Sequence, residues 1–201
     1  FTVDTTQAGS ASNTFVLPLG SGTFNYAINW GDGNTETSTS SSDLTHVYAT
    51  SGTYQIKISG TFPHIRFNNS GDKAKLISVE NLGDVGWSSF DSAFFGCNKF
   101  SSFTVGNAVT SGVTSLVQMF RNCSILNAGS FNNLDTSNVT NMRDMFLSVT
   151  AFNQDIGAWN TANVTNIQAM FLGASSFNQD ISAWNTVNVT SMGSMFSSAT
   201  A

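Results

Sequence analysis

Charge is scarce in this sequence: only 9% of its 201 residues are Asp, Glu, Lys or Arg, and the net charge is -5. A chain with seven basic residues and a negative balance lacks the patch that binds phosphate backbones or anionic membranes. No apolar run reaches the roughly 18 residues of a membrane helix. We therefore expect no nucleic-acid partner and no membrane insertion. A disordered acidic tail is excluded as well, because 40% of the residues are apolar.

Cysteine and histidine are rare too, with two of each. Cysteines without a CxxC pair, and histidines without a second ligand nearby, supply neither a metal site nor a disulfide framework. Asp32 lies between two glycines, where it could bind calcium or act as an acid, but a turn residue that bonds its own backbone is the favoured interpretation. Nothing assembles a nucleophile, a base and an oxyanion donor. We expect no catalytic, metal-binding or cofactor-binding residues, and a chain that is not an enzyme.

A 25-residue repeat organises the second half of the chain. Residues 142–146, 167–171 and 192–196 read MRDMF, IQAMF and MGSMF, and the text between them recurs as FNQDI followed by AWNT. Earlier, more divergent copies begin at Phe90 and Leu116. A fixed period of this length is typical of a solenoid, in which one coil buries its apolar face only by stacking on the next.

Each coil has an expected local structure. The segment VTNM at 139–142 and its equivalents predict a short strand that pairs in parallel with its neighbours. The Met-Phe pair and the small residue after it fit one face of a short helical turn lying against that strand. The small-residue position holds Cys97 and Cys123 in the two earliest coils, close enough for a disulfide in principle. Val or Ala at this position in the later coils favours two free, buried thiols.

These coils resemble the BspA-type leucine-rich repeat, a repeat of 25–26 residues that has Phe, Trp and Met where an ordinary leucine-rich repeat has Leu. The resemblance is close over residues 113–201 and looser over residues 76–112. It implies a surface protein without a common enzymatic activity. One period after Phe177 falls beyond Ala201, so we expect the last coil to be incomplete and its end to be covered by a partner or by further chain.

The first 62 residues read as a different, all-β unit. Short strands are predicted at residues 14–19, 24–30, 44–48 and 53–59. Turn signals such as Gly31-Asp-Gly-Asn34 separate these β-branched and aromatic runs, and this spacing suggests a β-sandwich. The motifs WGDG at 30–33, HVY at 46–48 and GTY at 52–54 resemble those of the PKD domain, an Ig-like sandwich common in surface and secreted proteins.

The predicted fold class is therefore mainly β, in three parts. A PKD-like, Ig-like sandwich spans residues 1–62, and a joint with the N-terminal cap of the solenoid spans residues 63–88. A leucine-rich-repeat-type solenoid with short parallel strands and short helical turns spans residues 89–201. The chain begins with Phe1 rather than Met, so we expect an export signal or an upstream segment to lie outside this sequence.

The repeated Asn-Gln-Asp and Trp positions are the best candidates for a contact surface. Exposed Trp can stack on sugars or anchor a protein interface. Trp that closes the core and Asn that bonds to turns would explain the same repeats, and that interpretation is favoured. The candidate residues are Asn153, Gln154, Asp155, Trp159, Asn178, Gln179, Asp180 and Trp184. Asn-Val-Thr triplets at 138–140, 163–165 and 188–190 are formal glycosylation acceptors that arise from the repeat.

The expected function is a non-enzymatic cell-surface or extracellular adhesion protein that binds a protein or glycan on another surface. The alternative is a structural subunit of an assembly, such as a phage or virus appendage, fibre or decoration protein, with self-association or an assembly contact at the open last coil. A sugar-processing enzyme would need an acidic pair in a cleft, whereas the acids of the coils mostly recur by position.

Overall fold

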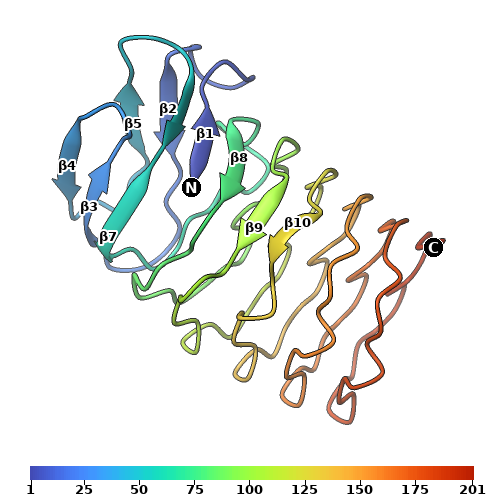
Figure 1. The fold of residues 1–201 in the computed structure, drawn as a ribbon. Coiled ribbons are helices and arrows are strands. Elements are labelled where there is room, and N and C mark those ends of the chain that lie inside the picture. Colours follow the sequence, from blue (N-terminus) through green and yellow to red (C-terminus); the bar gives the residue numbers. More distant parts are fainter.

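The chain is all-β and contains no helix (Figure 1). A computed structural model describes all 201 residues. The strands are β1 (Thr2–Asp4), β2 (Thr14–Leu17), β3 (Asn25–Asn29), β4 (Thr35–Ser38), β5 (Leu44–Val47), β6 (Thr53–Gln55), β7 (Lys57–Thr61), β8 (Leu76–Val79), β9 (Ser102–Thr104) and β10 (Ala128–Ser130). They form a five-stranded sheet in the order β10-β9-β8-β1-β6, a pair β2-β5 and a three-stranded sheet β4-β3-β7.

Strands β2, β3 and β5 lie within the segments predicted as strands at residues 14–19, 24–30 and 44–48. In β3 the alternation is visible as burial, since Tyr26 and Ile28 are buried while the residues between them are exposed. The predicted strand at 53–59 is instead divided at Ile56 into β6 and β7, which belong to different sheets. Alternation thus identifies the buried face of a strand but does not say which strand it pairs with.

The separate Ig-like sandwich predicted for residues 1–62 is wrong. Its strands form small sheets, and β1 pairs in an antiparallel manner with β6 on one side and with β8 on the other. Strand β8 in turn pairs in parallel with β9, and β9 with β10. One sheet therefore joins the N-terminal part to the beginning of residues 89–201, here called the stacked repeats.

The predicted solenoid of parallel strands and short helical turns is also wrong. After β10 the repeats contain no strand, and only single parallel bridges connect Ser115 to Asn141, Asn141 to Asn166 and Asn166 to Ser191. Turns occupy about half of each repeat, and the orange-to-red part of Figure 1 shows neither arrows nor helices. The repeats still lie one after another along the chain, but several small sheets and turns take the place of the expected strand-and-helix coils.

Backbone geometry explains why the Met-Phe segments are not helical. In the segment 142–149, the N–H groups of Met145, Leu147 and Val149 bond to carbonyls three residues back, whereas the N–H groups between them bond to the next repeat. An α-helix needs i to i-4 bonds throughout. Asp144 and Ser148 also have φ angles of +57° and +58°, which fit the third residue of a type II turn and not a helix.

Aromatic rings in register build the core of the stacked repeats. The phenylalanine column, defined as Phe94, Phe120, Phe146, Phe171 and Phe196, has centroid separations of 5.7, 5.5, 5.6 and 5.6 Å between successive rings. A methionine precedes each of the last four phenylalanines and is buried in every case. This core is continuous with that of the N-terminal part, and together they form one cluster of 48 buried residues.

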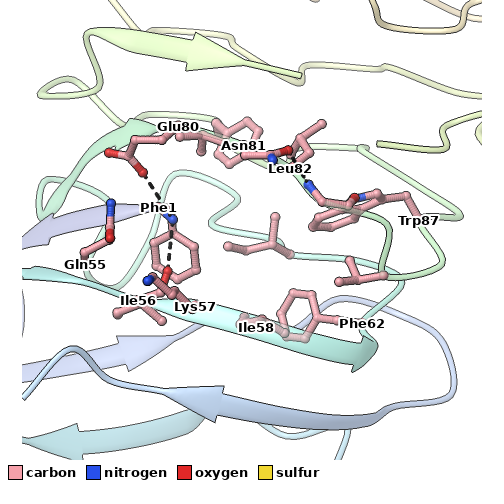
Figure 2. A pocket seen from close by; sticks show the side chains of 15 residues that line it. Phe1, Gln55, Ile56, Lys57, Ile58, Phe62, Glu80, Asn81, Leu82 and Trp87 are labelled. Carbon is pink, nitrogen blue, oxygen red and sulfur yellow. Dashed lines mark hydrogen bonds and ion pairs between the residues drawn. The ribbon is translucent and has the colours of Figure 1, made fainter. Parts of the chain in front are cut away.

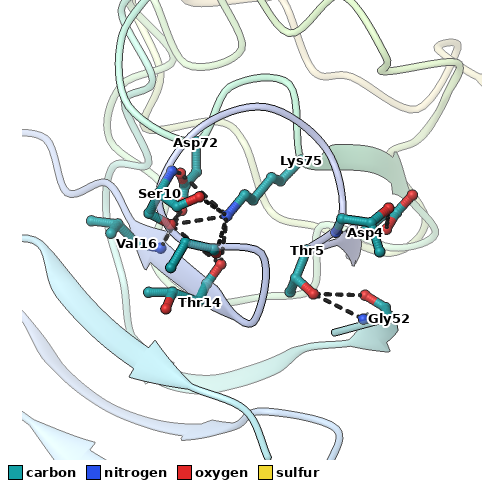
Figure 3. Close-up of polar contacts among 10 residues, drawn as sticks. Asp4, Thr5, Ser10, Thr14, Val16, Gly52, Asp72 and Lys75 are labelled. Carbon is teal, nitrogen blue, oxygen red and sulfur yellow. Dashed lines mark hydrogen bonds and ion pairs between the residues drawn. The ribbon is translucent and has the colours of Figure 1, made fainter. Parts of the chain in front are cut away.

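A buried ion pair fastens the N-terminal segment to the joint (Figure 3). The side chains of Lys75 and Asp72 are 0% and 1% exposed, and their charged atoms are 3.7 Å apart. Lys75 Nζ donates to the backbone carbonyls of Ser10, Ala11 and Thr14 and contacts the Ser10 hydroxyl at 2.9 Å. Asp72 accepts the N–H groups of Ser10 and Val16. Burial lowers the pKa of Lys75, and these acceptors hold the ammonium in place.

Candidate interaction surface

The repeated Asn and Gln side chains bond one repeat to another. Asn153 Oδ1 accepts the backbone N–H of Asn178 and the side-chain amide of Gln179, both at 2.9 Å. The side-chain amide of Gln154 makes the equivalent bond one repeat earlier, to Asn127 Oδ1 at 3.2 Å, and also donates to the backbone carbonyl of Asn127 at 2.8 Å. These amides therefore bond one repeat to the next, and part of their bonding capacity is used inside the molecule.

The carboxylates beside these amides remain exposed. Asp155 Oδ1 accepts the N–H of Gly157 at 2.9 Å, and Asp180 Oδ1 accepts the N–H of Ser182 at 2.8 Å. The hydrogen bonds from Ser182 lower the pKa of Asp180. Each carboxylate thus closes a turn with one oxygen and turns the other to solvent.

The two tryptophans of the candidate set lie in the core. Trp159 and Trp184 are 3% and 8% exposed, and their rings stack with centroids 6.4 Å apart. Each indole N–H donates at 3.1 Å to a backbone carbonyl of the preceding repeat, Phe131 for Trp159 and Ile156 for Trp184. Rings in this position close the repeat and do not present a face on which a sugar could stack.

An uncharged polar surface lies along the Asn-Val-Thr triplets. Thr140, Thr165 and Thr190 are exposed, and each hydroxyl donates to the carbonyl of the corresponding threonine one repeat earlier, at 3.1 to 3.3 Å. The amides of the exposed Asn138, Asn163 and Asn188 donate to the preceding repeat in the same manner. We call these six residues the Asn-Thr face. The hydroxyl donors and one N–H of each amide are used internally, so the free groups of the face include hydroxyl and amide oxygens that can accept hydrogen bonds.

The candidate set predicted from the sequence did not include the Asn-Thr face. The signal was present, because Asn-Val-Thr alternates outward, inward and outward in three successive repeats. Val139 and Val164 are fully buried between their exposed neighbours. The segment was predicted as a short strand, and applying the alternation of a strand to Asn-Val-Thr would have identified the exposed column.

In the N-terminal part, Asp32 and His46 form a pair that supports a turn. His46 Nε2 lies 2.9 Å from Asp32 Oδ2, and the His46 ring stacks on Trp30 with a centroid separation of 4.6 Å. Asp32 Oδ1 also accepts the backbone N–H of Asn34, which is the turn role predicted from the sequence. Burial alone would raise the pKa of Asp32, but the hydrogen bonds from His46 and Asn34 outweigh it and lower the pKa to about 2.

A pocket lies between β7 and the segment that follows β8 (Figure 2). Its volume is about 330 Å³, and 10 of its 15 lining residues are hydrophobic, among them Phe62 and Trp87. Lys57 and Glu80 contribute charged groups. No local pattern predicts this pocket, because its lining comes largely from two segments that the predicted boundary after residue 62 places in different parts of the chain.

Other potential reactive groups are enclosed or isolated. Cys97 and Cys123 are free and fully buried, as the later residues of their column predict, and burial raises the pKa of both thiols. No group of three or more His, Cys, Asp or Glu side chains is placed to hold a metal ion. The structure also has no helix that could cross a membrane.

These features define an all-β protein of stacked, uncharged polar repeats. A family model described as "Mycoplasma protein of unknown function, DUF285" matches residues 88–201, and the chain belongs to this family. The match agrees with the BspA-like, surface-protein part of the resemblance described above. Comparison with curated proteins and with solved structures gave no match.

Proposed function

We propose that the chain is a non-enzymatic surface or extracellular binding protein, and that the Asn-Thr face meets a protein or glycan on another surface. The regular row of exposed acceptors on this face is the observation that carries the proposal. Hydroxyl and amide oxygens at the repeat spacing suit a partner that offers hydroxyl or N–H donors, as glycans and extended peptides do. Membership in a surface-protein family supports the same function.

The N-terminal part would act as a base for this face. The PKD-like motifs around Trp30 and His46 are typical of surface and secreted proteins, and the shared sheet through β1 and β8 would hold the repeats in a fixed orientation. The proposed location is therefore the cell surface or the extracellular space. The exposed carboxylates of Asp155 and Asp180 would form a second, weaker contact region.

Binding to an array of host glycans and extracellular-matrix proteins tests the proposal. The double variant Thr140→Lys/Thr165→Lys places two long cationic side chains on the Asn-Thr face, and we expect it to weaken binding of the ligand by at least about tenfold. Gln168→Lys introduces the same charge at an exposed position outside the face and serves as the control. Equal binding by both variants would reject the Asn-Thr face as the binding site.

We keep as the second candidate a structural subunit of an assembly such as a phage or virus appendage. Sedimentation of the native protein from its source separates the two candidates. Fractionation with the cell envelope supports the binding protein, and co-sedimentation with a large particle supports the assembly subunit.

A further inference from the structure

A half-exposed column of large side chains runs along the turns of the stacked repeats. Its members are Phe95, Arg121, Leu147 and Leu172, and each directly follows a member of the phenylalanine column. Their backbone carbonyls accept the N–H groups of residues 69, 96, 122 and 148 at 2.8 to 2.9 Å, so the four residues hold the same position in successive repeats. We call these four residues the Phe-Arg-Leu column.

The residue types of this column differ from those of the Asn-Thr face. That face presents only Asn and Thr, whereas the Phe-Arg-Leu column leaves three large apolar side chains and one arginine partly in solvent. The interior of the repeats does not require them, because the phenylalanines and methionines just before them already fill it. Apolar side chains and arginine that gather on a surface are typical of a protein interface.

Arg121 is the polar centre of the column. Its Cζ lies 5.1 Å from the centroid of the Phe95 ring, and its Nη1 lies 3.4 Å from Asp144 Oδ2. A guanidinium has five N–H donors. This is the one hydrogen bond that Arg121 makes through them, and its Nε is buried without an acceptor. A guanidinium held over a ring is already oriented and keeps donors for a second carboxylate.

Positive charge exceeds negative charge around Arg121. Arg121 and Arg143 both approach the same oxygen of Asp144, at 3.4 and 3.7 Å, so one carboxylate serves two guanidinium groups. Asp91, at the start of the first turn segment, is engaged by a hydroxyl and an N–H of the following repeat. The chain as a whole has a net charge of -5, so this local excess of positive charge favours a partner with an acidic group.

The spacing of the column fits a helix better than an extended strand. Successive rings of the adjacent phenylalanine column are 5.5 to 5.7 Å apart over these four repeats. One turn of an α-helix advances by about 5.4 Å, whereas side chains on one face of a strand recur at about 6.6 Å. Over three steps a helix would drift from the column by less than about 1 Å, and a strand by about 3 Å.

We propose that the Phe-Arg-Leu column is a docking surface for an amphipathic helix of a partner protein, with one acidic residue inside the apolar stripe of that helix. The carboxylate lies over Arg121, and apolar side chains at successive turns of the helix contact Phe95, Leu147 and Leu172. This interaction goes beyond the proposed function, because no residue of the column belongs to the Asn-Thr face.

A synthetic peptide of about 20 residues with blocked ends tests the proposal. It carries leucine, glutamate, leucine and leucine at successive intervals of four, three and four residues, with Ala, Gln and Lys elsewhere. In a fluorescence anisotropy titration of the 201-residue chain we expect a Kd below about 300 μM. A peptide of the same composition without this spacing, and one with a central proline that interrupts the helix, should each bind at least about tenfold more weakly. Equal binding of either control peptide would overturn the proposal.

A double-mutant cycle tests the contact between Arg121 and the glutamate. We expect Arg121→Gln in the protein, or glutamine in place of the glutamate in the peptide, to raise the Kd about tenfold. The two changes together should raise it hardly more than either alone, because both remove the same contact. The peptide change needs no altered protein, so it remains informative if Arg121→Gln does not fold. An unchanged Kd for the glutamine peptide, or fully additive losses, would overturn the assignment of Arg121.

Leu172→Ser tests the apolar part of the column. We expect it to raise the Kd at least about fivefold, whereas Val109→Ser, at a side chain that is 54% exposed outside the column, should leave the Kd unchanged. Equal losses would overturn the docking surface. The variant Thr140→Lys/Thr165→Lys separates this result from that of the proposed function, because it should lose glycan binding and keep peptide binding. Loss of peptide binding in that variant would contradict a separate surface.

Discussion

At the scale of single residues, position within a column decides what a side chain contributes. Phe171 is fully buried and stacks on Phe146 and Phe196 at 5.6 Å and on Phe177 at 4.0 Å. Phe196, in the same column, is 48% exposed. We expect Phe171→Ala to lower the free energy of unfolding by about 3–5 kcal/mol, because it leaves a cavity between two rings.

Phe196→Ala is the matched control for that variant. The same atoms are removed from a ring that is half in solvent, so we expect a loss of only about 1 kcal/mol. Urea unfolding followed by tryptophan fluorescence measures both values. Losses of similar size would show that the column does not bury its interior members more effectively than its last one.

Asp32 gives a dependence on pH. Its pKa falls from the ordinary 3.8 to about 2 in the folded chain, so its contribution to stability is fully present above pH 3.8 and is lost as the pH falls toward 2. We expect Asp32→Asn to be less stable than the parent chain at pH 5, and the difference to shrink steadily between pH 4 and pH 2. Urea midpoints at several pH values measure it, and a difference that stays constant over this range would contradict the assignment.

At the scale of elements, Gly129 fixes the pairing of β9 and β10. Its φ is +109°, and a Cβ at this position would overlap the backbone carbonyl of Phe103 in β9. We expect Gly129→Ala to cost at least about 2 kcal/mol, because backbone atoms cannot give way as a flexible side chain can. Circular dichroism during urea unfolding measures the loss.

Gly173→Ala is the comparison for Gly129→Ala. Gly173 also has a positive φ of +72°, but the nearest atom to an added Cβ would be Ser148 Oγ at 3.6 Å. Only the conformational cost of about 1 kcal/mol remains. A loss for Gly173→Ala as large as that for Gly129→Ala would show that the left-handed backbone, and not the close approach to Phe103, sets the cost.

The elements of the N-terminal part were more predictable than those of the repeats. Strands β2, β3 and β5 follow from local runs of β-branched, aromatic and other apolar residues, and β3 also shows alternating burial. The helical turns expected around Met145-Phe146 do not form, because the buried pair is equally compatible with consecutive turns whose alternate N–H groups bond the next repeat. In these Met-Phe segments Asp144, Ser148 and Ala169 adopt positive φ angles. None of them is a glycine, which is the residue from which a positive φ is normally predicted.

The sequence identified the repeated Asn, Gln, Asp and Trp residues, but not whether they contact other repeats or a partner. Repetition alone located Asn153, Gln179 and Trp184, and the structure places all three at contacts between repeats. Composition does not tell whether a repeated polar side chain bonds to its own copy or faces a partner. The pocket beside Phe62 and Trp87 could not be predicted, because it depends on how β7 and β8 approach each other in space.

At the scale of the whole molecule, the structure is continuous across the predicted boundary after residue 62. Strand β1 pairs with β6 from one side of the boundary and with β8 from the other, and the 48 buried core residues form one cluster. The buried Lys75 holds residues 10 to 14 against the joint. Sequence reasoning divided the chain because its motifs change there, but pairing between distant strands is not encoded in local motifs.

This continuity predicts that the two ends of the chain unfold together. The indole N–H of Trp30 donates to Glu36 in the N-terminal part, and that of Trp159 donates to Phe131 in the repeats, so their NMR signals report on the two regions separately. We expect both native signals to disappear at the same urea concentration. In Lys75→Ala, Asp72 stays buried without its partner, and we expect a loss of about 3–5 kcal/mol in the free energy of unfolding. The two urea midpoints should then shift by the same amount. Val187→Ala, at a side chain that is 79% exposed, should leave both midpoints unchanged. Separate midpoints in the parent chain, or a shift of the Trp30 midpoint alone in Lys75→Ala, would mean that residues 1–62 are an independent domain after all.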